Sequence, residues 1–151
     1  MRTMRWIGPW ICVAALAIGC SDYGSDEKGT YQAPILAADA SGVLELKGGI
    51  DFGQAVSDSY SKDKVLTGYV FDANQGARVT LSLTSANGED PVLVLYGPLS
   101  RQGAWGEHIA LDDDGKDGHN ALINDFALPA TGRYLAGLAS FDGSAGGPFE
   151  L

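Results

Sequence analysis

The sequence predicts an all-β protein, built as an antiparallel β-sandwich of jelly-roll type with about eight strands. Short runs of β-branched and aromatic residues are separated by clusters of Gly, Asp, Asn and Ser. No apolar period of about 3.6 residues persists along the chain, so we expect very little helix. Glycine supplies 21 of the 151 residues, which fits a chain with many turns. Many short strands at this spacing are typical of sandwiches and jelly rolls.

The expected strands are short and follow one another along the chain. The run 78–84 alternates apolar with hydroxyl-bearing side chains, as a half-buried strand requires. The run 92–96 is apolar on both faces, which places it at the centre of a sheet. The full set comprises 43–47, 65–72, 78–84, 92–96, 108–111, 121–127, 134–140 and a last strand near Phe149.

Two connections between these strands carry turn signals. Residues 73–77 join their strands closely enough to predict a β-hairpin. Residues 128–132 predict another turn, because Pro129 and Gly132 set backbone angles that a strand cannot continue through.

The first residues are predicted to be a lipoprotein signal peptide over 1–19. Arg2 and Arg5 precede an apolar run that ends at Gly19, too short for the roughly 20 residues that a membrane-spanning helix needs. The ending Ala17-Ile18-Gly19-Cys20 resembles the lipobox of bacterial lipoproteins, although Ala17 stands where Leu is usual. That resemblance implies that Cys20 is acylated and becomes the mature N-terminus. An ordinary signal peptide with an incidental cysteine is the alternative.

Charge and cysteine content limit the partners of the exported chain. Removal of Arg2 and Arg5 with the signal takes the formal net charge from −9 to −11, which argues against nucleic acid as a partner. Membrane attachment then depends on the acyl chains, because an acidic protein is not drawn to anionic lipid heads. Cys12 leaves with the signal, so no disulfide is expected. Residues 20–40 are polar and glycine-containing at their start and are expected to form the lipidated cysteine and a flexible tether.

The remaining residues, 41–151, are expected to form one domain that carries five motifs in order. The motifs are Gly68-Tyr69-Val70-Phe71-Asp72-Ala73, Gly76-Ala77-Arg78-Val79-Thr80-Leu81, Asp90-Pro91-Val92-Leu93-Val94-Leu95-Tyr96-Gly97-Pro98, Asp112-Asp113-Asp114-Gly115 and Leu128-Pro129-Ala130-Thr131-Gly132-Arg133-Tyr134-Leu135. Their order and spacing over residues 42–151 resemble the bacterial pre-peptidase C-terminal (PPC) domain family. The resemblance implies a non-catalytic jelly-roll sandwich, found beside secreted peptidases and in envelope lipoproteins, with roles in substrate or matrix binding and in secretion. It also implies a final hairpin over the last motif. In the family the last strand usually runs a few residues further than Phe149-Glu150-Leu151, so we expect either a slightly truncated chain or a short final strand.

The sharpest local feature is an acidic loop over residues 112–120. Asp112, Asp113, Asp114 and Asp117 repel one another unless they are solvated or share a cation. Calcium takes six to eight oxygen ligands, which Asp/Gly loops can supply, but the spacing is not that of an EF-hand. Some PPC-like domains bind calcium, so two interpretations stay open, a Ca²⁺ site and a solvated acidic loop.

Two common catalytic motifs, a zinc-binding histidine pair and a nucleophile elbow, do not occur in the sequence. The two histidines, His108 and His119, form no His-Glu-x-x-His pair, and no Gly-x-Ser-x-Gly nucleophile motif occurs. Two aromatic residues are candidate ligand contacts. Trp105 lies between glycines in a long connection and Tyr60 lies in a serine-rich one, where an exposed ring is a common device for contacting sugars or proteins. Trp105 folding back to cap the sandwich is the alternative.

The sequence therefore predicts a lipid-anchored cell-envelope protein with one monomeric, non-catalytic binding or accessory domain. The expected partners are the membrane, through the acyl anchor, and an envelope protein or polysaccharide. Ser21 follows the acylated position, where Asp would favour inner-membrane retention in enteric bacteria, so the outer membrane of a Gram-negative bacterium is the expected location. The alternatives are a calcium-stabilised carbohydrate- or matrix-binding module, with Trp105 and the acidic loop as its site, and an enzyme of unrecognised type.

Overall fold

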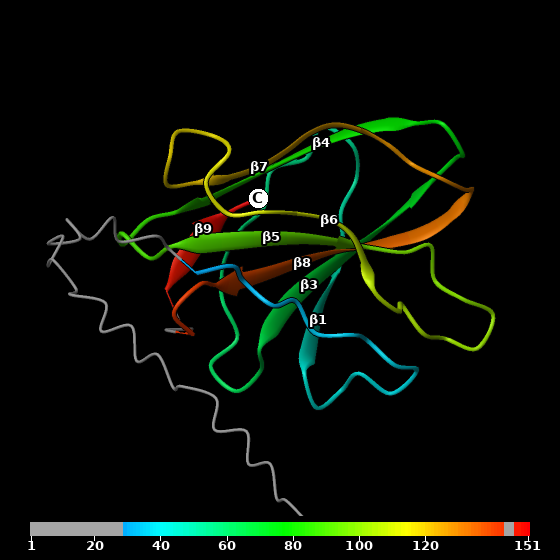
Figure 1. The fold of residues 1–151 in the computed structure, drawn as a ribbon, viewed down its shortest axis with the longest axis horizontal. Coiled ribbons are helices and arrows are strands. Elements are labelled where there is room, and N and C mark those ends of the chain that lie inside the picture. Colours follow the sequence, from blue (N-terminus) through cyan, green and yellow to red (C-terminus); the bar gives the residue numbers. More distant parts are fainter. Residues whose placement is uncertain (1–28, 144–146) are drawn as a thin grey trace, which may run out of the picture.

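Nine strands in two sheets make up the fold (Figure 1). The computed structural model describes residues 29–143 and 147–151, and none of these is in a helix. Consequently no helix in the described part of the chain has the length and apolar character to cross a membrane. The strands are β1 (Leu44–Gly49), β2 (Ser57–Ser59), β3 (Leu66–Ala73), β4 (Arg78–Ser85), β5 (Pro91–Tyr96), β6 (His108–Asp112), β7 (Ala121–Ala127), β8 (Gly132–Ser140) and β9 (Pro148–Glu150).

The two sheets form a sandwich, which confirms the predicted all-β class. One sheet has the strand order β1-β3-β8-β5-β6 and the other has the order β2-β9-β4-β7. All neighbouring strands are antiparallel except β1 and β3, which are parallel. Each range expected from the sequence overlaps a strand of the structure, and the structure adds β2. Its residues Ser-Asp-Ser have no apolar pattern, so only its pairing with β9 makes it a strand.

Strand β5 lies between β8 and β6 in the large sheet and is buried on both faces, as its composition predicts. Leu93 and Leu95 point between the sheets and join the main core, with Leu83 of β4 and Ile123 of β7. The opposite face of β5 belongs to a second apolar cluster that contains Leu36, Val92, Val94, Tyr96 and Leu135. The large sheet is therefore covered on both faces.

The segment that covers this outer face corrects the expected extent of the tether. Leu36 is only 1% exposed, and its N–H donates to the carbonyl of Gly106 at 2.9 Å. The Tyr96 hydroxyl donates to the carbonyl of Pro34 at 3.0 Å. Residues from about 31 to 40 thus pack on the domain, because the apolar outer face of β5 and β8 needs a cover. A flexible tether to residue 40 is wrong for this part.

The two turns are not hairpins, because each connects strands of different sheets. Residues 74–77 lead from β3 in one sheet to β4 in the other, and residues 128–131 lead from β7 back to β8. The two arches bond to each other, since the Gly76 N–H donates to the Leu128 carbonyl at 2.9 Å and the Leu128 N–H donates to the Ala77 carbonyl at 2.8 Å. The hairpins expected at 73–77 and over the last motif are therefore wrong. Local spacing fixes where a chain turns but not which sheet it enters.

Two motifs that are far apart in the sequence pack together at this end of the sandwich. Tyr134 is fully buried, and its hydroxyl donates to the carbonyl of Ala130 at 2.5 Å. A Cβ atom at Gly132 would lie 2.8 Å from Cβ of Pro98, and one at Gly97 would lie 2.8 Å from Cδ1 of Tyr134. The Gly-Pro and Pro-x-x-Gly-x-Tyr motifs are thus explained by one close contact, in which both glycines leave room for their neighbours.

Candidate functional site

A cleft of about 340 Å³ opens beside the small sheet, between β4 and the connection from β1 to β2. One wall is the connection itself, residues 50–55, and the other is the edge of β4. Ile50, Phe52, Phe71, Val79 and Leu81 give the cleft an apolar lining. Its polar lining comes from Asp51, Glu150 and Lys116 and from the hydroxyl side chains of β4.

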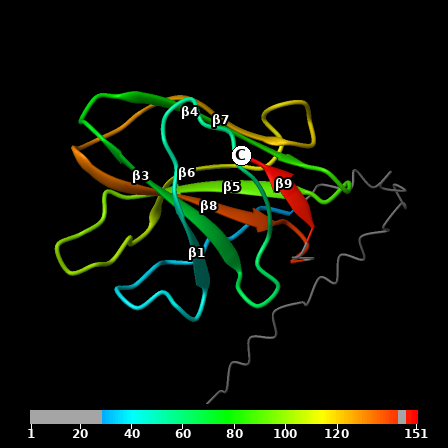
Figure 2. The same cartoon turned by 180° about the vertical axis from the view of Figure 1, so that it is seen from behind.

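The connection of residues 50–56, which includes the wall, is hydrogen-bonded to both sheets at its ends. The Ile50 N–H donates to the Val70 carbonyl of β3 at 2.9 Å, while Val56 and Leu151 exchange two main-chain bonds of 2.9 Å. A turn lies between these ties, and its Asp51 N–H donates to the side-chain Oε1 of Gln54 at 3.0 Å. Figure 2 shows the connection (teal) leaving β1 and passing over the side of the sandwich toward β4.

Phe52 stands at the tip of this wall and is 66% exposed. Its ring lies 5.8 Å from that of Phe71, in an edge-to-face arrangement with an interplanar angle of 75°. An aromatic side chain with this much free surface beside an apolar cleft is a feature of binding surfaces rather than of cores.

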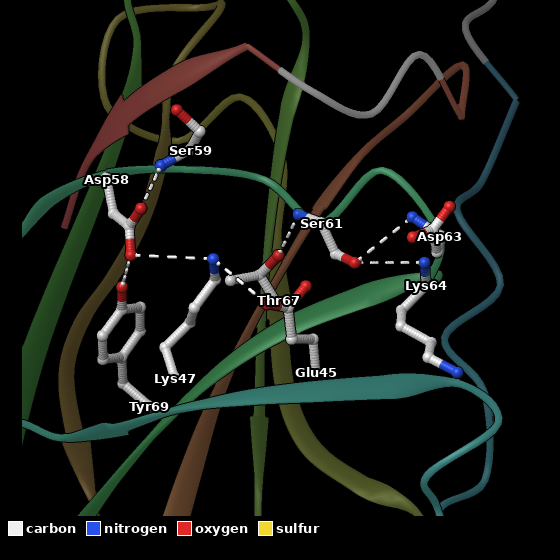
Figure 3. Close-up of polar contacts among 9 residues, drawn as sticks. All are labelled: Glu45, Lys47, Asp58, Ser59, Ser61, Asp63, Lys64, Thr67 and Tyr69. Carbon is white, nitrogen blue, oxygen red and sulfur yellow. Dashed lines mark hydrogen bonds and ion pairs between the residues drawn. The ribbon is translucent and has the colours of Figure 1, made fainter.

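A polar network clamps the two ends of the wall together (Figure 3). Tyr69 of β3 donates its hydroxyl to Oδ2 of Asp58 in β2 at 2.7 Å, and Lys47 Nζ of β1 lies 3.9 Å from the same oxygen. The Ser59 N–H donates to the other Asp58 oxygen at 2.7 Å. Strands β1 and β2 flank residues 50–56, so this network holds the wall at a fixed distance from the sandwich.

A second part of the network fixes the turn that follows β2. The buried Ser61 N–H donates to Oγ1 of Thr67 at 2.7 Å, and Oγ of Ser61 accepts from the N–H groups of Asp63 and Lys64 at 3.3 and 3.1 Å. In Figure 3 Glu45 lies beside Lys47, and their charged atoms are 3.2 Å apart. The network therefore continues from β1 to the start of β3.

The carboxylates of this network are held in their charged form. The hydrogen bond from Tyr69 is the main cause that lowers the pKa of Asp58, with the Ser59 N–H and Lys47 adding to it. A hydrogen bond from Ser61 and the neighbouring Lys47 lower the pKa of Glu45. Burial, with the bond to Asp58, raises the pKa of Tyr69. These shifts favour charged carboxylates on Asp58 and Glu45 and a protonated hydroxyl on Tyr69, which maintains the hydrogen bonds that position the chain.

The acidic loop is held together by hydrogen bonds from main-chain N–H groups and from the Asn120 side chain to its own carboxylates. Asp112 Oδ2 accepts from the N–H groups of Gly115 and Leu122 at 2.8 and 2.7 Å. Both carboxylate oxygens of Asp117 accept from Asn120, through its N–H and its side-chain amide, at 2.7 Å each. Across residues 29–143 and 147–151, no three His, Cys, Asp or Glu side chains gather as a metal cluster would. Both interpretations of this loop, a Ca²⁺ site formed by Asp112, Asp113, Asp114 and Asp117 and a solvated acidic loop, stay predictions.

The two predicted contact aromatics take different places. Tyr60 is only 3% exposed, and its ring packs at a tilt on that of Phe149 in the main core, with centroids 5.0 Å apart, so the expectation of an exposed ring there is corrected. The Tyr60 ring is buried by apolar residues of the main core, which come from distant strands, and not by the serines beside it in the sequence. Trp105 is partly buried against the second cluster, and its N–H donates to the Leu36 carbonyl at 3.1 Å. The structure therefore brings neither ring to the cleft.

The remaining sequence candidates also lie away from the cleft. His108 is exposed on β6 with its ring 6.5 Å from that of Tyr96, and His119 is exposed in the acidic loop. Neither lines this cleft or the second one, beside residues 62–65 and 140–143. Cys20 lies outside the described residues. Sequence reasoning missed the cleft residues, although Phe52 in a polar, glycine-containing turn was a signal for them.

Comparisons with known proteins find similarity at the level of the fold. No family model matches the chain, and no curated protein matches it. A periplasmic lysozyme inhibitor of g-type lysozyme, PliG of Aeromonas hydrophila, is similar with a TM-score of 0.52 and 16% identity, over 72% of this chain and 95% of the inhibitor. The pre-peptidase C-terminal domain of a collagenase from Bacillus anthracis is similar with a TM-score of 0.52 and 18% identity, over 71% of this chain and 92% of that domain. The chain thus has a PPC-like β-sandwich fold.

Proposed function

We propose that this protein is a lipid-anchored envelope protein whose sandwich is a non-catalytic binding or accessory domain. The observation that carries the proposal is the cleft beside β4, which is walled, partly apolar and open, and which holds no histidine. A site of this kind offers contact area and hydrogen bonds, which are what a binding domain needs. The fold likeness to a periplasmic inhibitor and to a PPC domain supports an exported accessory role.

The anchor is Cys20, and the outer membrane is its proposed destination. Acylation of one cysteine with two or three chains gives firm attachment, because each buried methylene contributes about 0.8 kcal/mol. The acidic domain, with a formal net charge of −9 for the whole chain, is then held at the membrane by lipid and not by charge. An envelope protein or polysaccharide is the proposed class of partner.

Metabolic labelling with an alkyne fatty acid tests the anchor directly. The full chain is expressed in a Gram-negative host as wild type, as Cys20→Ser and as Cys12→Ser, which is the matched control. Wild type and Cys12→Ser are expected to take up label and to sediment with outer-membrane density. Cys20→Ser is expected to lose both properties. Equal labelling of all three chains, or a wild-type chain that remains unlabelled, contradicts the anchor.

A further inference from the structure

We infer that Asn87 is a site of spontaneous chemical modification, at which the side-chain amide is hydrolysed and the residue becomes aspartate or isoaspartate. This modification is independent of the proposed binding role and of the lipid anchor. The sequence contains four asparagines and three Asp-Gly pairs, all of which could react in this way. The structure leaves both reacting groups free at Asn87 and engages at least one of them at each of the other positions.

The reaction needs two neighbouring groups, Cγ of an asparagine and the main-chain nitrogen of the next residue. The nitrogen attacks Cγ, the new C–N bond closes a five-membered succinimide ring, and the side-chain nitrogen leaves as ammonia with the proton of the attacking N–H. Water then opens the ring at one of its two carbonyl groups. Opening at one carbonyl gives aspartate, and opening at the other gives isoaspartate, in which the main chain runs through the former side chain. No oxidant or reductant is consumed.

Asn87 and Gly88 present both groups to solvent. They are exposed in the turn of residues 86–90, which joins β4 of one sheet to β5 of the other at one end of the sandwich (Figure 1). Gly88 has a φ of +71° and open space where a Cβ would lie, so no side chain shields its nitrogen. Among the described residues, no hydrogen bond uses the Asn87 side chain or the Gly88 N–H. Both reacting groups are therefore free to approach each other.

The other three asparagines are held by hydrogen bonds. At two of them the nitrogen that would attack is already a donor. These bonds run from the Gln75 N–H, after Asn74, to Oγ1 of Thr131 at 2.9 Å and from the Asp125 N–H, after Asn124, to Oγ1 of Thr80 at 3.0 Å. At the third, Asn120, the side-chain amide itself donates to Oδ2 of Asp117 at 2.7 Å. Each of these bonds must break before the ring can close, which slows the reaction.

The three Asp-Gly pairs are engaged as well. Aspartate before glycine can form the same succinimide, with loss of water in place of ammonia. In every pair the glycine N–H is a hydrogen-bond donor. The bonds run from Gly115 to Oδ2 of Asp112 at 2.8 Å, from Gly118 to the Asp114 carbonyl at 2.9 Å and from Gly143 to the Ser140 carbonyl at 3.1 Å. The structure therefore distinguishes Asn87-Gly88 from every similar pair in the described residues.

The turn that contains Asn87 is bonded to the sandwich at both ends. The Ala86 N–H donates to the Pro148 carbonyl of β9 at 3.2 Å, and the Asp90 carbonyl accepts from the Phe141 N–H at 2.8 Å. Isoaspartate at this position lengthens the main chain between the two bonds by one methylene group. It also adds a third carboxylate to a turn that already has two. We expect both hydrogen bonds to weaken in the modified protein.

Peptide mapping by mass spectrometry measures the modification in the full chain, incubated at physiological pH and temperature. We expect Asn87 to lose its amide at least tenfold faster than any other asparagine. We expect isoaspartate to exceed aspartate in the product, which electron-transfer fragmentation distinguishes. Asn87→Gln is expected to remove the reaction at this position, because glutamine would have to close a larger ring. Hydrogen exchange at the Ala86 and Phe141 amides is expected to be faster in the aged wild type than in the aged variant.

A matched variant separates the effect of the structure from that of the sequence. Gln75→Gly creates a second Asn-Gly pair, whose N–H can still donate to Oγ1 of Thr131. In the folded variant we expect Asn74 to react at least fivefold more slowly than Asn87, whereas in denaturing urea we expect equal rates. Adding Thr131→Val removes the acceptor and is expected to raise the rate at Asn74 in the folded protein.

Three results would overturn the inference. The first is an Asn87 that loses its amide no faster than the other asparagines of the folded wild type. The second is an equal rate at Asn74 and Asn87 in the folded Gln75→Gly variant, which would show that the free N–H has no influence. The third is unchanged hydrogen exchange at the Ala86 and Phe141 amides after modification, which would contradict the expected effect on the turn. The first comparison needs only the wild-type protein, so it remains decisive if Gln75→Gly fails to fold.

Discussion

Tyr69 and Asp58 join the two sheets through one hydrogen bond of 2.7 Å, from a hydroxyl in β3 to a carboxylate in β2. The Tyr69 ring is 5% exposed and also packs edge-to-face on Phe149 of β9, with centroids 6.2 Å apart. The bond therefore has a fixed donor and a partly solvated acceptor. The bond fixes β2, the strand that follows the connection of residues 50–56, to β3 of the other sheet.

Tyr69→Phe keeps the ring and removes this bond. We expect the free energy of unfolding to fall by about 1 kcal/mol, the usual net value of such a bond, because Asp58 can still bind water. Urea denaturation of Tyr69→Phe, Asp58→Asn and the double variant gives the coupling between the two residues. Additivity of the two single losses to within about 0.3 kcal/mol would contradict a direct interaction.

Gly97 is expected to tolerate no side chain. Its φ is +123°, and a Cβ there would lie 2.8 Å from Cδ1 of Tyr134 and 3.1 Å from the Arg133 carbonyl oxygen. Gly97→Ala should therefore destabilise the protein by about 3 kcal/mol, from backbone strain and overpacking together. Gly103→Ala is the control, because Gly103 has a φ of +81° with nothing within 4 Å of the added atom. It should cost about 1 kcal/mol from backbone strain alone. Equal losses in urea melts would show that the contact with Tyr134 is unimportant.

The segment before β1 is expected to belong to the domain. Leu36 is 1% exposed and its neighbour Ile35 is 69% exposed, so the two form a matched pair. Leu36→Ala should lower the free energy of unfolding by about 2–4 kcal/mol through the cavity it leaves. Ile35→Ala should change it by no more than about 0.5 kcal/mol. If both substitutions change the free energy of unfolding by a similar small amount, residues 31–40 belong to the flexible tether and not to the domain.

Much of the sandwich follows from local sequence, whereas its connections and its cleft do not. The alternation over 78–84 and the apolar run over 92–96 each predict a strand and its burial, because those signals are carried by consecutive residues. Strand β2 has no such signal and exists through its partner β9. The arch over 74–77 looks like a hairpin for the same reason, since the choice of sheet depends on pairings far along the chain.

The site residues illustrate the same limit. The acidic loop stood out in the sequence, yet Asp112 and Asp117 serve to hold its turns. The cleft is assembled from β4, the wall of residues 50–55 and Glu150, which are distant in sequence. Its polar clamp, Lys47, Asp58 and Tyr69, comes from three strands. No rule based on spacing in the sequence could have predicted that these three residues lie together.

Acid is expected to destabilise the fold below about pH 4. Hydrogen bonds from Arg133, Arg78 and Tyr69 lower the pKa of Asp72, Asp125 and Asp58 respectively. The unfolded carboxyls, with a pKa of about 3.9, therefore take up protons before the folded ones do. The stability these groups contribute is present above that pKa and is lost as the pH falls through the folded values.

Urea midpoints measured from about pH 7 down to about pH 3 test this linkage. The midpoint should be level at the upper end and should drop at the lower end, and Asp72→Asn with Asp125→Asn should flatten the drop. The chain also carries a net charge of −9, whose self-repulsion weakens as carboxylates are protonated. A midpoint that rises below about pH 4 would mean that the stability gained from weaker self-repulsion exceeds the stability lost when the paired carboxylates are protonated.

Calcium is expected to leave the melting temperature unchanged. Asp112 already accepts two main-chain N–H groups, and both oxygens of Asp117 are bonded to Asn120, so a cation would have to displace bonds that hold the loop. A ligand that binds only the folded state would raise stability by about 2.7 kcal/mol at a hundredfold excess over its dissociation constant. Melts of the full chain in millimolar calcium and in excess chelator should therefore superimpose. A calcium-dependent rise that Asp114→Ala abolishes would establish a metal site in this loop and would make the calcium-stabilised carbohydrate- or matrix-binding module the better account of the protein.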